Sequence, residues 1–254
     1  MTTVTFLGTG TSQGVPVIGC TCPVCRSLDF RDKRLRTAVH INVDGLSLCI
    51  DTGPDFRQQM LRENINHLDA ILVTHGHKDH TAGLDDVRAY NYIQQTDMPV
   101  YGTTPTLEQL KVEFAYAFAA EYYPGIPRIA LNTIDKEPFT IQNVTITPLP
   151  VMHHRMPVLG FRIGDFSYIT DANFIAPETM KLLRGSKTLV LNALQHEPHI
   201  SHFSLSDALA VAREVNAPQT YFTHISHKLG LHADVSRDLP ENIDLAYDGL
   251  QLTL

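Results

Sequence analysis

Residues 75–80 read His-Gly-His-Lys-Asp-His, which places four potential metal ligands within six positions. The apolar run 70–74 directly before them predicts a buried strand, so the histidines are expected in a loop at the edge of a sheet. Imidazole nitrogens and carboxylate oxygens suit zinc, manganese or iron, and alternate side chains of one loop can serve two neighbouring ions. Residues 75–80 therefore predict a site for two metal ions.

Three residues further along the chain, each at the end of a predicted strand, are candidates to complete this site: His153, Asp171 and His224. The neighbouring His154 leaves the first of them ambiguous, because only the phase of the preceding strand separates the two histidines. Asp171 could also cap a helix, but it lies several residues before the helix that begins near Ala176. Asp51 can form a turn before Gly53 or orient ligand histidines from behind, and these two roles are compatible.

Cys20, Cys22 and Cys25 form a second cluster of potential ligands. Their spacing is too tight for a disulfide framework and is typical of a metal clip. Three thiolates need one more Cys or His to complete a tetrahedral site, and His227 is the best candidate because it lies close after His224. The cluster therefore predicts a structural zinc ion that ties the N-terminal loop to the rim of the metal site. The alternative is a reduced cysteine cluster without metal.

The bulk composition limits the kinds of partner that this chain can bind. It has 254 residues with 43% hydrophobic content, and its formal net charge is −7 with a pI near 6.0. A chain of this size without a low-complexity linker is expected to form a single domain over 1–254. The negative net charge disfavours a long nucleic acid as partner but allows a small anionic substrate near bound cations.

No apolar run approaches the length of a membrane span and the N-terminus lacks a basic leader, so a cytoplasmic protein is expected.

Strands and helices follow each other in two similar halves of the chain. Branched and aromatic residues indicate the strands, and helical periodicity indicates the helices. The expected strands are 2–7, 37–43, 46–51, 70–74, 139–149, 158–164, 166–170, 187–192 and 219–223, with short strands at the C-terminus. The expected helices are 54–63, 83–95, 106–120, 177–184 and 204–216. This order predicts an α/β fold of the αββα sandwich type, with two mixed β-sheets flanked by helices.

With these residues in place, the chain resembles the metallo-β-lactamase superfamily. Residues 75–80 match the signature H-x-H-x-D-H of that superfamily at every position, and Gly83 completes its usual extension. His153 is preferred over His154 because family members place the ligand directly after a pair such as Val151-Met152. The resemblance assigns His75, His77 and His153 to a first metal, Asp79, His80 and His224 to a second, Asp171 to the bridge between them, and Asp51 to the support of the ligand histidines.

Four further motifs narrow the resemblance to one branch: Gly8-Thr9-Gly10, Gly14-Val15-Pro16, the Cys-x-Cys-x-x-Cys clip and His224-Ile225-Ser226-His227. That branch contains the phosphoribosyl cyclic phosphodiesterase of the carbon–phosphorus lyase pathway, and it is related to the transfer-RNA-processing ribonuclease Z. The resemblance covers nearly the whole chain, from about residue 4 to residue 230. The long basic arm by which many ribonuclease Z enzymes hold transfer RNA is not obvious here, which weakens an RNA-processing interpretation.

In this branch a histidine on the far side of the cleft contacts the scissile phosphate, and His202 matches its position. The resemblance therefore implies that His202 is the general acid. A helix-entry role is the alternative, because Ser204 could cap a helix over 205–216 with Asp207 in a capping-box-like start. His196 and His199 are weaker candidates for the general acid and are expected at the surface or rim.

The predicted activity is metal-dependent hydrolysis of a small or cyclic phosphodiester. Two divalent ions, zinc or manganese, would activate a hydroxide that attacks phosphorus, with His202, Asp79 and Asp171 as catalytic residues. The rivals are a nuclease of the ribonuclease Z type and a hydrolase of carboxylic esters or thioesters. A non-catalytic metal-binding protein is disfavoured because every expected ligand position is filled. The expected partner is a small phosphodiester, and formation of a homodimer is left open.

Overall fold

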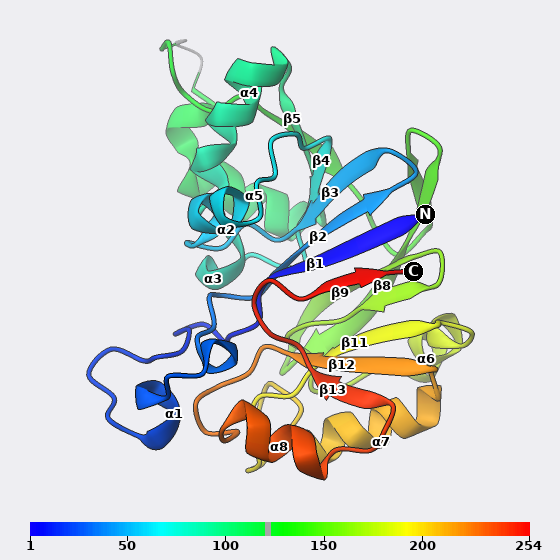
Figure 1. The fold of residues 1–254 in the computed structure, drawn as a ribbon. Helices are drawn as coiled ribbons and strands as arrows, with labels where there is room; N and C mark the ends of the chain where they lie inside the picture. The colour runs from blue at the N-terminus through cyan, green and yellow to red at the C-terminus, as the bar shows by residue number, and fades with distance from the viewer. Residues whose placement is uncertain (120–122) are drawn as a thin grey trace.

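Two β-sheets pack face to face between outer layers of helices (Figure 1). The structure is a computed structural model that describes residues 1–119 and 123–254. Each sheet has seven strands among these residues and contains both parallel and antiparallel pairs. The predicted αββα sandwich of two mixed sheets is therefore confirmed. Within the same residues, no helix combines the length and the apolar character needed to cross a membrane.

The first sheet begins with an antiparallel meander and continues with parallel strands. Its order is β14-β1-β2-β3-β4-β5-β6, and the pairing is parallel from β3 onward. The strands are β1 (Thr2–Gly8), β2 (Ala38–Val43), β3 (Leu46–Ile50), β4 (Ala70–Leu72), β5 (Met98–Gly102), β6 (Ile129–Thr133) and β14 (Gln251–Thr253). Because β3 and β4 are parallel neighbours, the loops that follow them leave the sheet at the same edge.

The second sheet has the same mixture of pairings. Its order is β13-β12-β11-β10-β9-β8-β7, antiparallel from β7 to β10 and parallel from β10 to β13. The strands are β7 (Phe139–Ile141), β8 (Val144–His153), β9 (Met156–Ile163), β10 (Phe166–Tyr168), β11 (Thr188–Asn192), β12 (Gln219–Thr223) and β13 (Ile243–Leu245). The loops after β10 and β12 therefore also lie at one edge.

Helices cover the outer face of each sheet (Figure 1). The first sheet is covered by α2 (Phe56–Arg62), α4 (Arg88–Gln94) and α5 (Thr104–Glu113), with the short α3 (Lys78–Thr81) at its edge. The second is covered by α6 (Pro177–Leu183), α7 (Leu205–Val215) and α8 (His232–Asp238). The short α1 (Pro23–Arg26) lies in an N-terminal loop that projects from the sandwich. That loop carries the cysteine cluster.

The inner faces of the two sheets form the central core. Phe6, Ile41 and Leu48 of the first sheet are fully buried in one cluster with residues of the second, such as Phe161 and Tyr168. Burying one apolar side chain of this size contributes about 1.5–3 kcal/mol. Branched and aromatic residues suit strands because they pack well on a pleated surface. The packed sheets therefore give the edge loops a rigid support.

Two predicted elements are wrong in their bounds because the chain turns inside or near them. The strand expected over 139–149 is a hairpin of β7 and β8, since Gln142 takes a left-handed conformation with a φ of 52°. The second of these strands continues to His153. The helix expected over 83–95 begins as a 3-10 turn and then stops one residue early, because Gln95 is also left-handed with a φ of 57°.

The structure also contains segments for which no strand or helix was predicted: β5, β6, α8 and the short helices α1 and α3. The segment of β5 contains Pro99 and Gly102, which are depleted in strands, and β6 is only partly buried. The α8 segment contains Asp, Ser and Val, which are weak helix formers. The helix expected over 106–120 corresponds to α5, which begins two residues earlier and ends at Glu113; residue 120 lies outside the described residues. Tertiary packing, rather than local propensity, determines the secondary structure and the bounds of these segments.

The predicted site residues lie at strand ends along one edge of the sandwich. Asp51 follows β3, His153 ends β8, Asp171 follows β10 and His224 follows β12. Asp51, Asp171 and His224 have φ values of 66°, 53° and 55°. Left-handed backbone is uncommon outside glycine, and here it turns the side chain away from the direction of the strand.

The loop after β3 packs closely against the loop that carries residues 75–80. Thr52 N donates to His80 O, and Gly83 N donates to Thr52 O, each at 2.8 Å. A Cβ atom on Gly83 would overlap the carbonyl oxygen of Gly53 and would lie 2.8 Å from Phe56 Cβ. The φ of Gly83 is an ordinary −92°, so this position needs glycine because of the close backbone approach.

We expect Gly83→Ala to lower the free energy of unfolding by about 1–3 kcal/mol, because the two loops must separate to admit a methyl group. Chemical denaturation of the purified variant measures this change. Gly102→Ala is the matched control, because the nearest atom to its Cβ would be the movable end of the Leu107 side chain, at 3.1 Å, and no backbone atom would lie as close as in Gly83→Ala. The control should change stability by less than about 1 kcal/mol. Equal effects of the two substitutions would contradict the packing argument.

Candidate dinuclear metal centre and cysteine clip

Two groups of side chains at this edge have the composition of metal sites, and they share one carboxylate. The first group is His75, His77, His153 and Asp171, and the second is Asp79, His80, His224 and Asp171. Within each group the candidate ligand atoms lie within 4.8 Å of one another. The structure thus brings together the side chains that the sequence assigned to the two metals. His154 is exposed and belongs to neither group.

Three ligand atoms in these groups are buried without a hydrogen-bond partner among the described residues: His75 Nε2, His80 Nε2 and His224 Nδ1. They lie 3.7, 3.3 and 2.8 Å from a carboxylate oxygen of Asp171, in that order. Buried polar atoms normally find partners, because an unsatisfied group costs about 1–3 kcal/mol. Nitrogen lone pairs gathered around a shared carboxylate suit divalent cations, so this donor set fits the two implied ions.

Asp51 supports two of the ligand histidines from behind. Its Oδ2 accepts hydrogen bonds from His80 Nδ1 at 2.7 Å and from Thr74 Oγ1 at 2.8 Å. Thr74 Oγ1 in turn accepts from His75 Nδ1 at 3.0 Å. With both Nδ1 atoms acting as donors, the Nε2 lone pairs of His75 and His80 face the site. This geometry agrees with the orienting role that the resemblance implies for Asp51.

The other two buried ligand histidines are held in the same way. His153 Nδ1 donates to the carbonyl oxygen of Ser201 at 2.8 Å, which leaves its Nε2 to face the site. His224 Nε2 lies 3.2 Å from Thr11 Oγ1, which leaves its Nδ1 to face the site. Fixing one ring nitrogen decides which nitrogen offers a lone pair to a metal, so each contact selects the ligand atom.

Burial and neighbouring charges set the ionisation of these groups. Burial lowers the pKa of His75 well below its usual range, and it also lowers the pKa of His153. Burial opposes ionisation of Asp171, but His224 and His80 beside it hold the pKa of that carboxyl well below its usual value. Burial opposes protonation of His80, but the carboxylates of Asp171 and Asp51 raise its pKa well above the usual value, so a cation must displace a proton from this imidazole.

His202 lies where the two ligand groups meet. Its Nε2 is 3.3 Å from Asp171 Oδ2, and its side chain is 11% exposed. The ring stacks on His224 with centroids 4.9 Å apart and meets His153 edge-on at 4.7 Å. The capping box begun by Ser204 is also present at the start of α7, but it does not use the His202 side chain. Helix capping therefore does not account for the position of this imidazole.

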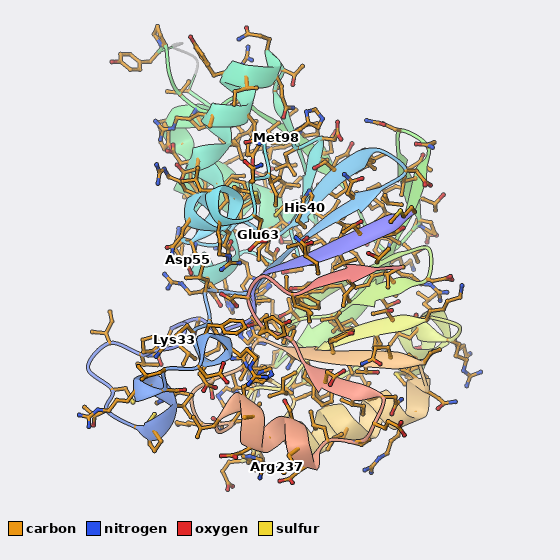
Figure 2. The ribbon with its side chains drawn as sticks, viewed as in Figure 1. Lys33, His40, Asp55, Glu63, Met98 and Arg237 are labelled. Carbon is orange, nitrogen blue, oxygen red and sulfur yellow. The ribbon has the colours of Figure 1, made fainter. Side chains whose placement is uncertain are left out.

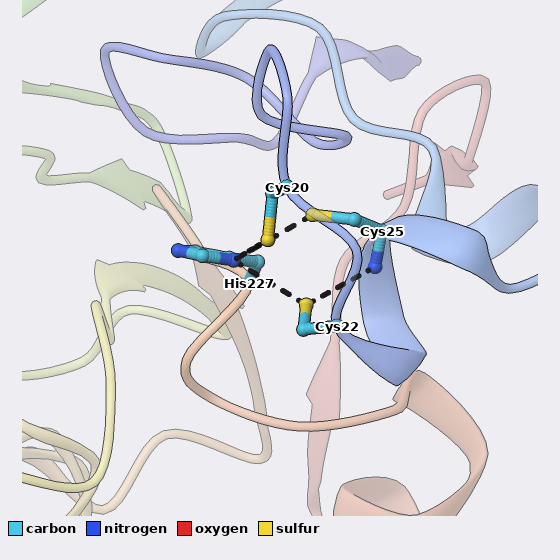
Figure 3. A group of neighbouring side chains, drawn as sticks. All are labelled: Cys20, Cys22, Cys25 and His227. Carbon is cyan, nitrogen blue, oxygen red and sulfur yellow. Dashed lines mark hydrogen bonds between the residues drawn. The ribbon is translucent and has the colours of Figure 1, made fainter.

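Cys20, Cys22, Cys25 and His227 form a separate cluster at the rim (Figure 3). The three sulfur atoms lie 3.3, 3.4 and 3.5 Å from His227 Nδ1, and none of them is in a disulfide. Three thiols and one imidazole suit a tetrahedral zinc ion. Lys33, in the same N-terminal loop (Figure 2), donates from Nζ to the carbonyl oxygen of Cys25 at 3.1 Å.

Backbone N–H groups point at two of the sulfur atoms in this clip. Cys22 Sγ accepts from Cys25 N, and Cys25 Sγ accepts from Val17 N, both at 3.4 Å. The backbone hydrogen bond from Cys25 lowers the pKa of Cys22 to about 6, whereas burial raises the pKa of Cys25 to about 11. The thiolate is the form of cysteine that binds zinc, and such N–H donors stabilise it.

The structure adds three residues that the sequence did not assign to the site: Thr11, Thr74 and His199. The two threonine hydroxyls contact ligand histidines, and His199 Nδ1 lies 3.2 Å from His202 Nδ1. His196 and His199 are exposed, as expected of rim residues. Thr74 directly precedes a ligand histidine, and that adjacency was the one sequence signal available for it. Nothing local to the sequence marks Thr11.

Residues 47–225 match the family model of the β-lactamase superfamily domain. The chain belongs to this superfamily. A curated relative, the octanoyltransferase of Porphyromonas gingivalis, is 39% identical over 97% of this chain and 50% of its own length. The chain spans about half of the length of the first curated relatives that it matches.

Two solved structures resemble this β-lactamase-superfamily chain over nearly its whole length. One is described as a new diphosphatase from the PhnP family; it is 42% identical, with a TM-score of 0.94, over 100% of this chain and 98% of that one. The other is the short form of human tRNase Z, 18% identical with a TM-score of 0.70 over 99% of this chain and 98% of that one, which shows the shared fold alone. The predicted superfamily, its phosphodiesterase-like branch and the fold are confirmed, and a metal-dependent hydrolase is supported.

We expect Asp51→Asn to weaken metal binding at the dinuclear centre by about 10- to 100-fold, because an amide nitrogen must then face Thr74 or His80, both of which donate to the carboxylate. Titration of metal-depleted protein against a competing chelator measures the affinity. Asp55→Asn is the matched control, since Asp55 contacts the backbone N–H and guanidinium of Arg36 and no ligand histidine. The control should bind metal normally. Unchanged metal affinity in both variants would show that Asp51 does not support the ligand histidines.

Proposed function

We propose that this chain hydrolyses a small or cyclic phosphodiester with the help of two divalent metal ions. Membership of the superfamily supports a metal-dependent hydrolase. The 42% identity to the PhnP-family diphosphatase, over the whole of this chain, supports a phosphate ester or anhydride as the substrate class. The net charge of −7 agrees with a small substrate rather than a long polyanion.

The proposed ligands are the residues of the two groups that share Asp171. Zinc or manganese fits their nitrogen and oxygen donors. When bound, the two ions would supply Lewis-acid activation of the attacking water and would neutralise charge on the phosphate oxygens. A separate structural zinc ion is proposed for the clip. The ligands would be His75, His77 and His153 for one catalytic ion, Asp79, His80 and His224 for the other, Asp171 for both, and Cys20, Cys22, Cys25 and His227 for the structural ion.

The position of His202 is the observation that carries the proposal. Its ring contacts His153 of one ligand group, His224 of the other, and the shared Asp171. A phosphate that spans both groups would therefore lie within reach of this imidazole. The side chain is partly shielded yet accessible, which suits a group that must meet a substrate and transfer a proton.

The chain's own residues then have distinct tasks in the reaction. A water molecule gives up one proton to the solvent and attacks phosphorus; a new P–O bond forms, the bond to the leaving oxygen breaks, and a solvent proton later restores His202. His202 gives its Nε2 proton to the leaving alkoxide, which would otherwise be a poor leaving group. Asp79 and Asp171 would hold the metal ions, and the positive charge beside Asp171 keeps its carboxyl ionised. Asp51 keeps the histidine rings aligned from behind.

Hydrolysis of a carboxylic ester or thioester is the second candidate, because the P. gingivalis relative is named an octanoyltransferase. This chain spans 50% of that relative, so the name does not assign acyl transfer to the matching half. His202 discriminates only weakly between the two candidates: a thiolate leaves without a proton, but the alkoxide of a carboxylic ester needs one as much as the alkoxide of a phosphodiester does. A ribonuclease Z activity has weaker support, since the 18% identity to human tRNase Z indicates fold alone.

Two further expectations stay predictions, a single domain over 1–254 and a cytoplasmic location. Formation of a homodimer stays open. The central core draws on strands from both sheets, which agrees with one domain. The small-substrate prediction, with no long nucleic acid as partner, depends on the proposed activity.

We expect metal analysis of the purified protein to find about three ions per chain and Cys22→Ser to lose one zinc while it keeps the other two. The variant should also have a lower Tm, because the N-terminal loop has few core residues of its own. Cys49→Ser is the control, since it makes the same change at a buried cysteine outside the clip and should keep all the metal. An unaltered metal content in Cys22→Ser would reject the clip.

We expect His202→Ala to reduce hydrolysis of an alkyl phosphodiester by roughly 100-fold, the usual scale for a positioned acid, with both catalytic ions still bound. A nitrophenyl phosphodiester needs little protonation of its leaving group, so the same variant should lose much less activity on it. Steady-state rates on both substrates, together with a cyclic phosphodiester, a diphosphate ester and a thioester, test the proposal. A preference of the wild-type protein for the thioester would overturn it in favour of the acyl hydrolase.

A further inference from the structure

His199 contacts the proposed acid without touching the metal ligand groups. Its Nδ1 lies 3.2 Å from His202 Nδ1, and the ring centroids are 5.1 Å apart. Ser201 Oγ lies 3.0 Å from His202 Nδ1 and 3.3 Å from His199 Nδ1. The face of His202 that points away from Asp171 therefore meets two polar groups, one of them an exposed imidazole.

A histidine that gives up a proton from Nε2 carries a second proton on Nδ1, because both ring nitrogens are donors in the charged form. The Nδ1–H of His202 consequently needs an acceptor. A neutral His199 with its proton on Nε2 offers the Nδ1 lone pair at the correct distance. Burial, together with the nearby His202 and Lys228, lowers the pKa of His199, which favours this neutral form.

We infer that His199 is a positioning residue: its Nδ1 accepts the hydrogen bond of His202 Nδ1–H and directs His202 Nε2 toward Asp171 and the leaving group. The inference rests on the proposed role of His202 as the acid. A carboxylate often orients a catalytic histidine in this way, and here a second imidazole occupies that place. His199 is therefore more than an exposed rim residue.

Most of the hydrogen bonds that hold the backbone of this loop do not involve the His199 side chain; the exception is Ser201 N, which donates to His199 Nδ1 at 3.4 Å. Asn173 Nδ2 donates to Ile200 O at 3.0 Å, and Phe203 N donates to Ala172 O at 2.7 Å. The Ser201 carbonyl is held by His153, as described above. Truncation of His199 removes that one long contact and leaves the others, and the Tm of the variant reports any change in the loop. A kinetic effect can then be attributed to the lost imidazole contact.

The test compares His199→Ala, His199→Asn and His199→Gln on an alkyl and a nitrophenyl phosphodiester. The amide of Asn occupies the place of Nδ1, whereas the amide of Gln occupies the place of Nε2. His199→Ala should lose about 10- to 100-fold in kcat on the alkyl substrate, the scale of a lost hydrogen bond to a charged group, and much less on the nitrophenyl substrate. His199→Asn should recover most of that rate, and His199→Gln should not. Metal content and Tm of each variant check that the site is intact.

The double variant His199→Ala/His202→Ala separates this inference from the proposed function. If His199 acts through His202, the double variant should be no slower than His202→Ala alone. A selective loss in His202→Ala without one in His199→Ala would overturn the positioning role and leave the proposed acid intact. Equal losses on both substrates in His202→Ala would overturn the acid and this inference with it. Failure of His199→Asn to recover the rate would also overturn the Nδ1 contact.

Discussion

A buried carboxylate among histidines from both sheets is the constraint on which the site depends. Asp171 is 2% exposed, and its oxygens meet His75 and His80 from the loop after β4 and His224 from the loop after β12. An unpaired charge in this position would cost several kcal/mol, so Asp171 requires positive charge beside it. Bound cations would supply that charge and would leave the imidazoles neutral as ligands. The two sheets must keep their edges aligned for this arrangement to exist.

The same arrangement stores strain in the backbone. Asp51, Asp171 and His224 have left-handed φ values, each of which costs of order 1–3 kcal/mol in a residue other than glycine. Hydrogen bonds hold at least one of these turns in place, since Asp51 N donates to Leu72 O at 2.9 Å and its Oδ1 accepts from Thr74 N at 2.8 Å. The core between the sheets supplies the stability that offsets this strain. The site is therefore preorganised at a cost to the free energy of unfolding.

The clustering of the candidate ligands and the layer architecture could be predicted from the sequence because both depend on local patterns. Residues 75–80 have a fixed spacing, and apolar runs mark the strands that carry the other ligands. His153 and His154 could not be separated by pattern alone; in the structure the first ends β8 and is buried, and the second turns out with a φ of 57°. The contact of Thr11 with His224 joins residues 213 positions apart, and no local signal reports such a pair. Local sequence signals do not mark β5 and β6 as strands either, because tertiary packing determines the conformation of these two segments.

The N-terminal loop links the cysteine clip to the catalytic edge through backbone pairing. Thr11 N donates to Ile225 O at 3.1 Å, and Ile225 N donates to Thr9 O at 2.8 Å, so the loop runs beside the segment between His224 and His227. One end of that segment faces Asp171, and the other faces the three cysteines. The loop between β1 and β2 has only a small apolar cluster of its own, so it needs another source of order. An ion in the clip would fix the loop, and through Thr11 it would fix the ring of His224. The clip can therefore support the catalytic centre without contacting the substrate.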